Sequence, residues 1–206
     1  MTVLHPQCFG TISIVVCHYR YSRRVTTNRT RALDTAVELL GTAGIRALTH
    51  ARIDEQAGLP KGSTSNYFRT RRALVQGVAD RIAELERPEL GATVATPSSV
   101  DEFVEGMCAF LDHVTTVTRT QTTARIALML EASHDPVVRD TLSRIRAPMV
   151  SAMVVALATL GARDPRKAAW AVVACSEGLL LHRIARSDLP DARPILQLVT
   201  EAAIRS

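Results

Sequence analysis

Residues 47–72 read ALTHARIDEQAGLPKGSTSNYFRTRR, and this stretch predicts two short helices joined by a glycine turn. The first helix is expected to begin at Thr49, whose hydroxyl can accept a hydrogen bond from a free backbone N–H one turn on. Gly58 is expected to end it, because glycine readily adopts the left-handed conformation that closes a helix. Pro60 suits the first position of the second helix, where its missing N–H costs nothing.

The first helix has one apolar face and one polar face. Ile53 and Ala57 lie one helical turn apart and are expected to point to the core. The polar residues beside them are expected to face water, namely Arg52, Asp54 and Glu55.

The second helix is composed of small and polar residues, Lys61, Gly62, Ser63, Thr64, Ser65 and Asn66. Because glycine and the hydroxyl residues are mediocre helix formers, helix stability does not explain this composition. Short side chains with hydroxyl and amide groups allow close approach to base edges, and asparagine can pair with adenine. Tyr67 offers a hydroxyl to a phosphate and Phe68 an anchor to the core. The composition therefore predicts a helix that enters a DNA groove.

The charge distribution agrees with this prediction. No Asp or Glu occurs between Glu55 and Asp80, whereas four cations do: Lys61, Arg69, Arg71 and Arg72. Residues 1–94 carry 13 Lys or Arg against 8 Asp or Glu, and residues 95–206 carry 12 of each, so the net charge of +5 comes from the half with the motif. A solvated basic face would have the same charge, but together with the helix pair it favours DNA binding.

Residues 29–85 resemble the helix-turn-helix region of the TetR (tetracycline-repressor) family. The resemblance is most specific in AGLPKGSTSNYFRTRRAL, with its Ala-Gly pair, Lys-Gly-Ser run and Tyr-Phe pair. It implies that residues 61–66 form the recognition helix and that Tyr67 and Arg71 contact phosphates. Thr49 and Arg52 are the other expected DNA contacts. Pro60, and the small residues at positions 64 and 65, depart from the family pattern, so the operator sequence does not carry over.

Composition predicts an all-α fold. The chain has 206 residues, of which 47% are hydrophobic and 22% charged, and strand-like alternation is nearly absent. We expect about nine helices, with an N-terminal three-helix DNA-binding unit followed by a C-terminal ligand-binding and dimerisation bundle.

The expected divisions follow changes in composition. Residues 1–25 are interpreted as a poorly ordered extension, residues 26–87 as the DNA-binding domain with its connecting helix, residues 88–98 as a linker and residues 99–206 as the helical effector domain. The connecting helix is expected to stop before Pro88. Alternatively, the N-terminal segment forms a basic arm on DNA through Arg20, Arg23 and Arg24.

Capping signals mark the helices of the second half. Ser99 and Glu102 form a capping box, and Asp-Pro pairs at 135–136 and 164–165 open two further helices. The first of these is expected to run to Leu160 and to bend at Pro148.

The last two helices are apolar on more than one side, so one chain alone is not expected to cover them. We expect a homodimer through residues 165–204, by packing of these helices as a four-helix bundle. The resemblance implies the same arrangement. The alternative is that they complete a monomeric core.

The second half predicts a ligand pocket and no catalytic site. Glu131 and His134 have the Glu-x-x-His spacing of a di-iron site, but no second copy occurs, so neither a metal nor a cofactor is expected. The resemblance implies an effector pocket among apolar helical residues, for which the candidates are Phe103, Met107, Phe110, Met129, Met149, Met153 and Trp170. Glu131, His134 or His113 could orient the ligand.

The sequence therefore predicts a cytoplasmic, homodimeric transcription regulator, a repressor in most members of the resembled family and not an enzyme. Its partners would be a near-palindromic DNA operator and a small, largely apolar effector, with no membrane. The alternative is an all-α ligand carrier or protein-interaction module that does not bind DNA, and a gel shift on DNA beside its own gene separates the two.

Overall fold

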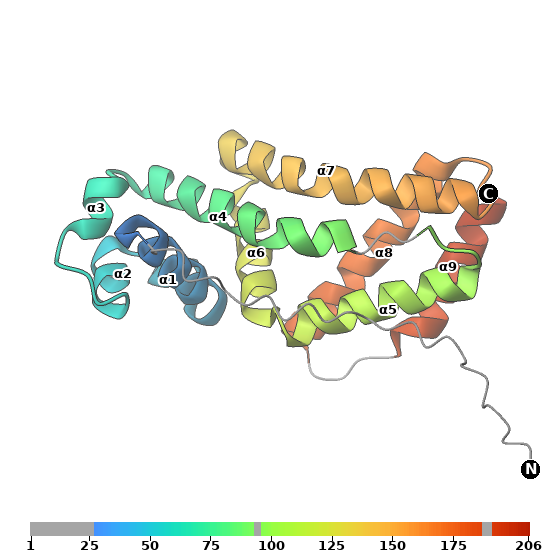
Figure 1. Ribbon diagram of the computed structural model, residues 1–206, viewed down its shortest axis with the longest axis horizontal. Helices are drawn as coiled ribbons and strands as arrows, with labels where there is room; N and C mark the ends of the chain where they lie inside the picture. The colour runs from blue at the N-terminus through green and yellow to red at the C-terminus, as the bar shows by residue number, and fades with distance from the viewer. Residues whose placement is uncertain (1–26, 93–95, 187–190) are drawn as a thin grey trace, which may run out of the picture.

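The computed structural model describes residues 27–92, 96–186 and 191–206, and all regular structure in these residues is helical (Figure 1). The expected all-α fold is confirmed. The elements are α1 (Asn28–Ala43), the short 3-10 turn η1 (Ile45–Ala47), α2 (His50–Gln56), α3 (Ser63–Tyr67), α4 (Arg71–Ala92), α5 (Val100–Thr116), α6 (Arg119–Glu131), α7 (Pro136–Thr159), α8 (Pro165–Ala185) and α9 (Ala192–Arg205).

Helices α1, α2 and α3 form a small unit at one end of the molecule (Figure 1). The hydroxyl of Thr27 caps α1 by accepting from the N–H of Thr30, and Gly44, with a φ of +75°, follows its last residue. Gly41 lies inside this helix. Ile53 of α2 and Phe68 after α3 are buried in the unit's core.

Helix α4 connects this unit to the rest of the molecule. It buries Leu74, Val78 and Ile82 against the unit's core. The expectation that α4 stops before Pro88 was wrong, because the helix continues to Ala92. The fixed φ of proline is helical, and the carbonyl that loses a partner belongs to Glu84, which lies on an exposed face where water can replace the bond.

The C-terminal helices share a second core, in which α8 packs on α7 and α9, and α5 packs on α9. The expected caps are present: Asp135 accepts from the N–H groups of Val137 and Val138, and Asp164 accepts from that of Lys167. The Ser99 hydroxyl accepts from the N–H of Glu102. The Glu102 carboxylate binds the N–H and hydroxyl of Ser98, one residue earlier than a standard capping box.

Helix α6 joins the two halves. Its residues Ala124 and Leu128 belong to the same buried cluster as Leu33 of α1 and Ile53 of α2. The core beneath the helix-turn-helix therefore extends into the second half of the sequence. The domain limits expected at 88–98 remain a prediction, and residues 1–25 lie outside the described part of the chain.

Candidate nucleic-acid interface and ligand cavity

Helix α2 and the turn after it follow the sequence prediction closely. The Thr49 hydroxyl accepts from the N–H of Arg52 at 3.4 Å, so α2 begins where expected. Gly58 has a φ of +61°, and the next residue, Leu59, donates its N–H to the Asp54 carbonyl at 2.8 Å. Helix α2 thereby ends in a left-handed turn whose backbone remains hydrogen-bonded.

Helix α3 begins three residues later than expected. Pro60 does not open it, because Gly62 has a φ of +87°, a left-handed conformation that no helical residue adopts. Residues 60–63 form a turn in which the N–H of Ser63 donates to the Pro60 carbonyl at 3.1 Å. Lys61 and Gly62 therefore lie in an exposed turn before the helix, where we predicted its first residues.

A buried carboxylate fixes α3 against α2. Asp54 was expected to face water, but it is only 3% exposed. Its two carboxylate oxygens accept from the N–H of Gly62 at 2.8 Å, the N–H of Thr64 at 2.8 Å and the hydroxyl of Thr64 at 2.5 Å. Sequence reasoning missed this residue, because the pairing joins two helices and leaves no local pattern.

The pKa of Asp54 reflects this setting. Burial raises the pKa, but the hydrogen bonds from Thr64 and Gly62 act in the opposite direction. The resulting pKa lies below the usual aspartate value, so the carboxylate is charged at neutral pH.

The side chain of Thr64 is not available to DNA. It is 0% exposed, and its hydroxyl donates to Asp54, so the expected contact of Thr64 with a base was wrong. Asn66 and Tyr67 are exposed, whereas Ser63 and Ser65 are half-buried. The surface of α3 that can meet a groove is therefore formed by its last residues and by the turn that precedes it.

Arg71 has a structural role that the sequence did not reveal. Its guanidinium donates to the carbonyls of Leu48 at 3.0 Å and Ile45 at 3.1 Å, which joins the start of α4 to the turn before α2. Arg72 forms an ion pair with Asp135 at 3.0 Å, whereas Lys61 and Arg69 are exposed. The phosphate contact of Arg71 stays a prediction, and Lys61 is the simpler cation to test.

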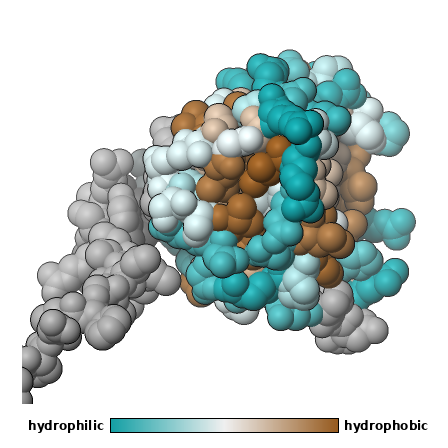
Figure 2. Space-filling model, turned by 90° about the vertical axis from the view of Figure 1, so that its right-hand side faces the viewer, coloured by the Kyte–Doolittle hydropathy of each residue, from teal (hydrophilic) through white to brown (hydrophobic). Residues whose placement is uncertain are grey.

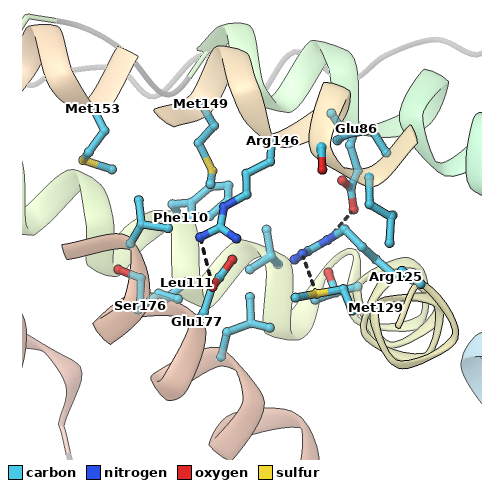
Figure 3. A pocket seen from close by; sticks show the side chains of 18 of the residues that line it. Glu86, Phe110, Leu111, Arg125, Met129, Arg146, Met149, Met153, Ser176 and Glu177 are labelled. Atoms are coloured by element: carbon cyan, nitrogen blue, oxygen red, sulfur yellow. Dashed lines mark hydrogen bonds and ion pairs between the residues drawn. The ribbon is translucent and has the colours of Figure 1, made fainter. Parts of the chain in front are cut away.

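A cavity of about 250 Å³ lies in the C-terminal half (Figure 3). Five of the expected pocket residues line it, namely Met107, Phe110, Met129, Met149 and Met153. Other apolar residues of its wall are Leu111, Val114, Leu142, Ile145, Val173 and Leu180. Helices α4 to α8 all contribute to the wall, so a ligand there would touch most of the bundle.

Two expected pocket residues lie elsewhere. Phe103 is buried in the second core, and Trp170 is 53% exposed on the outer face of α8, where its ring stacks on the Arg146 guanidinium at 4.9 Å. The polar groups expected to orient a ligand, Glu131, His134 and His113, are also absent from the described cavity wall. Helical periodicity identifies the residues on an apolar face of a helix. It does not show whether that face lines a cavity or packs elsewhere.

The charged groups in the cavity wall are arginines and glutamates that the sequence did not single out. Arg125 of α6 binds Glu86 of α4 at 3.0 Å, and Arg146 of α7 binds Glu177 of α8 at 3.2 Å. Arg139 also lies in the wall, and its guanidinium donates to the carbonyls at the end of α6. Each of the two ion pairs joins neighbouring helices across the cavity wall.

Helices α8 and α9 expose apolar residues on their outer side. Trp170 and Leu181 of α8 are 53% and 51% exposed, and Leu198 of α9 is 67% exposed. Figure 2 looks at the end of the molecule where α9 lies and shows hydrophobic residues gathered within a hydrophilic border. An apolar face of this kind usually marks a contact with another protein.

Comparison with known proteins gives two family matches. Residues 32–78 match "Bacterial regulatory proteins, tetR family", and residues 98–205 match "Tetracyclin repressor-like, C-terminal domain". Together they span both halves of the fold. No protein of curated function matches the chain.

Solved structures share the fold over almost their whole length. A protein from Rhodococcus sp. assigned to the TetR-family transcriptional regulators has a TM-score of 0.69 at 22% identity, covering 85% of this chain and 98% of that one. A regulator from Saccharomonospora viridis, in complex with choline, has a TM-score of 0.70 at 15% identity, covering 86% and 95%. The multidrug binding protein EbrR, complexed with imidazole, has a TM-score of 0.65 at 20% identity, covering 86% and 94%.

Proposed function

Because this chain belongs to the TetR family of transcriptional regulators, and is thus a DNA-binding regulator and not an enzyme, we propose that it acts as a homodimeric repressor. Two copies of α3 enter successive major grooves of a near-palindromic operator, about 34 Å apart. A small, largely apolar effector in the cavity releases the DNA. The protein works in the cytoplasm, where its operator lies.

The observation that carries the DNA-binding proposal is the way Asp54 holds α3. Its three hydrogen bonds fix the turn and the helix in one orientation and leave Asn66 and Tyr67 exposed. A recognition helix needs this combination of a rigid support and a free outer surface. The alternative of a ligand carrier gives no reason for supporting a short, weakly helical segment in this way.

The dimer proposal rests on the apolar outer side of α8 and α9. Trp170, Leu181 and Leu198 are large and exposed, and exposure of such residues to water is unfavourable. By length and composition alone α7 and α8 could also cross a membrane. We propose that a second copy of the chain, and not lipid, covers these residues, since the opposite end of the molecule must face DNA.

The effector proposal rests on the position of the cavity beside α4. Glu86 lies on this connecting helix and lines the cavity, where Arg125 of α6 binds it. A ligand that changes this contact shifts α4 and with it α3, so the two recognition helices no longer match both half-sites. A preference of a few kcal/mol for one dimer geometry is sufficient. Structural relatives that bind choline or imidazole support a ligand in this fold.

Footprinting of the purified protein on the DNA upstream of its own gene tests the function. Protection of two half-sites about one helical turn apart is expected. An absence of protection at about 100 mM salt, where specific complexes persist, would contradict a DNA-binding role.

Two substitutions separate the roles of the residues around α3. Lys61→Ala should weaken binding to operator and scrambled DNA alike and lower the salt dependence by about one counterion. Asn66→Ala should cost about 1–3 kcal/mol on the operator only, because it removes a base contact. Fluorescence anisotropy on both DNAs measures these effects, and equal losses on both DNAs from the two variants would refute the division.

A further inference from the structure

The cavity wall is mostly apolar but carries a small excess of positive charge. Its described residues include three arginines, Arg125, Arg139 and Arg146, against two glutamates, Glu86 and Glu177, which leaves +1. Both glutamates already bind an arginine. A cationic ligand would therefore have to displace a guanidinium, whereas an anionic ligand would complete the charge balance.

Arg125 retains donors for a ligand. A guanidinium has five N–H groups. The Arg125 Nε binds Glu86 at 3.0 Å, but its Nη1 faces the Met129 sulfur at 3.9 Å, and a thioether is a weak acceptor. A ligand oxygen at this point would replace the weak sulfur contact with a charge-assisted hydrogen bond.

Arg146 also has an N–H group that lacks an acceptor. Its Nη2 donates to Glu177 at 3.2 Å, while its Nε is buried and has no hydrogen-bond partner among the described residues. A buried donor without an acceptor is unfavourable. Figure 3 shows the guanidinium groups of Arg125 and Arg146 reaching toward the middle of the cavity from different sides.

We propose that the effector is an organic carboxylate with an apolar body. Its carboxylate lies between Arg125 and Arg146 and accepts hydrogen bonds from the guanidinium N–H groups that do not bind the two glutamates. Its apolar body lies among the methionines and Phe110. The inference rests on the proposed function, since it specifies the ligand of the same cavity. The proposed ligand differs from the choline and the imidazole bound by two structural neighbours. The reason is that the wall of this cavity offers guanidinium donors and no unpaired glutamate.

The size of the cavity selects the probe. A volume of about 250 Å³ holds roughly eight groups the size of a water molecule, each taking about 30 Å³. Octanoate, with a short alkyl chain and one carboxylate, fits this volume. Octan-1-ol and octylammonium also contain eight carbons, with a neutral and a cationic head of similar size, so the three probes differ mainly in charge at one end.

Calorimetric titration of the unaltered protein, without DNA, tests the proposal directly. Octanoate is expected to bind about tenfold or more tightly than octan-1-ol, since hydrogen bonds to charged groups are strong. Trp170, the only tryptophan of the chain, stacks on Arg146, so octanoate should also change its fluorescence. Equal affinity for octanoate and octan-1-ol, tighter binding of the cation, or no binding of any probe would overturn the proposal.

Substitutions locate the carboxylate. Arg146→Met should abolish the preference for octanoate over octan-1-ol, whereas Arg144→Met, two residues away on the exposed side of α7, should retain it. Because Arg125→Met alone would remove the cation that Glu86 binds and change the net charge of the wall, the double variant Glu86→Gln with Arg125→Met gives the second test and should also lose the preference. Full retention of the preference in Arg146→Met and in the double variant would overturn the assignment.

Operator binding in the absence of probe is measured separately. A protein that binds octanoate but protects no DNA in the footprint would refute the proposed function and not the ligand class. A protein that protects its operator but does not prefer octanoate would refute the ligand class alone.

Discussion

Asp54 supports a helix that could not support itself. Helix α3 has five residues, and serine, threonine and asparagine favour other backbone conformations through their own hydrogen bonds. The Asp54 carboxylate compensates by accepting from two backbone N–H groups and from the hydroxyl of Thr64. The orientation of the candidate recognition helix thus depends on one buried charge of α2.

Asp54→Asn should loosen α3 and lower stability. An amide offers one acceptor oxygen where the carboxylate uses two, so at least one buried N–H loses its partner, at a cost of about 1–3 kcal/mol. Operator affinity should fall together with stability. Because the pKa of Asp54 is lowered in the folded state, its contribution is complete at neutral pH and is lost as the pH falls through that pKa. The variant should therefore show a flatter stability profile below about pH 4.

Urea unfolding between pH 3 and 7 and anisotropy with operator DNA measure both effects. Glu55→Gln is the matched control, because Glu55 is the next residue of α2 and is exposed. It should retain affinity and the acid dependence. An Asp54→Asn protein with unchanged affinity and an unchanged acid limb would contradict the supporting role.

The roles of single residues could be predicted where they depend on neighbours in the sequence, but not where they depend on tertiary contacts. The cap at Thr49, the left-handed Gly58 and the buried Phe68 depend on a few neighbouring residues, and the sequence indicated each of them. The bond between Asp54 and Thr64 crosses from one helix to the next, so Asp54 looked like a solvated residue and Thr64 like a base contact.

Helix α6 and helix α1 approach closely at Gly41. A Cβ at this position would lie 2.1 Å from the Thr120 carbonyl oxygen, which is backbone and cannot rotate away. Helix α1 belongs to the DNA-binding unit, and α6 contributes Arg125 and Met129 to the cavity. The absence of a side chain at Gly41 therefore allows the two halves of the molecule to pack directly.

Gly41→Ala should push α1 and α6 apart. Overpacking of this kind costs about 1–3 kcal/mol, which exceeds the gain of about 1 kcal/mol in helix propensity. Thermal unfolding should show a lower midpoint. Gly106→Ala in α5 is the control, because a Cβ there meets no heavy atom within 4 Å, and it should raise the midpoint. Equal stabilisation by both substitutions would refute the close approach.

Helix limits were predictable where a side chain caps the end. Asp135 and Asp164, each followed by proline, mark the starts of α7 and α8 correctly. The two errors came from residues with context-dependent effects. Pro60 precedes a turn fixed by Gly62, and Pro88 lies within α4 because a helix can lose one hydrogen bond on an exposed face and continue.

The candidate DNA-binding surface and the candidate dimer surface lie in different parts of the molecule. Helix α3 lies at one end of the molecule, and α9 lies at the other, with α8 beside it (Figure 1). Helices α8 and α9 carry the exposed apolar residues Trp170, Leu181 and Leu198, and the cavity is lined by residues of α4 to α8. The cavity wall includes both α4, which leads to α3, and α8, which carries Trp170. A ligand in the cavity thus touches helices that belong to both surfaces.

A cavity in the second half could be expected from the methionines and aromatics there, but the sequence did not identify all the residues that line it. Met129 of α6 and Trp170 of α8 were both expected in the pocket, yet Met129 contributes to the wall and Trp170 lies outside. Helix α8 is apolar around most of its circumference, so its sequence does not distinguish a side toward a ligand from a side toward a second protomer.

Leu198→Asp tests the proposed dimer, because a carboxylate at the centre of an apolar interface would be buried without a partner. The variant should sediment as a monomer that still binds octanoate if the ligand assignment is correct. Operator affinity should fall by about 10²–10⁴-fold, because each recognition helix would then bind a half-site alone. Leu130→Asp is the control, since Leu130 is 74% exposed at the end of α6, a helix that packs mainly on α1, compared with 67% for Leu198. It should remain dimeric with unchanged operator affinity. A dimeric Leu198→Asp protein with full affinity would show that the outer side of α9 is not where two copies meet.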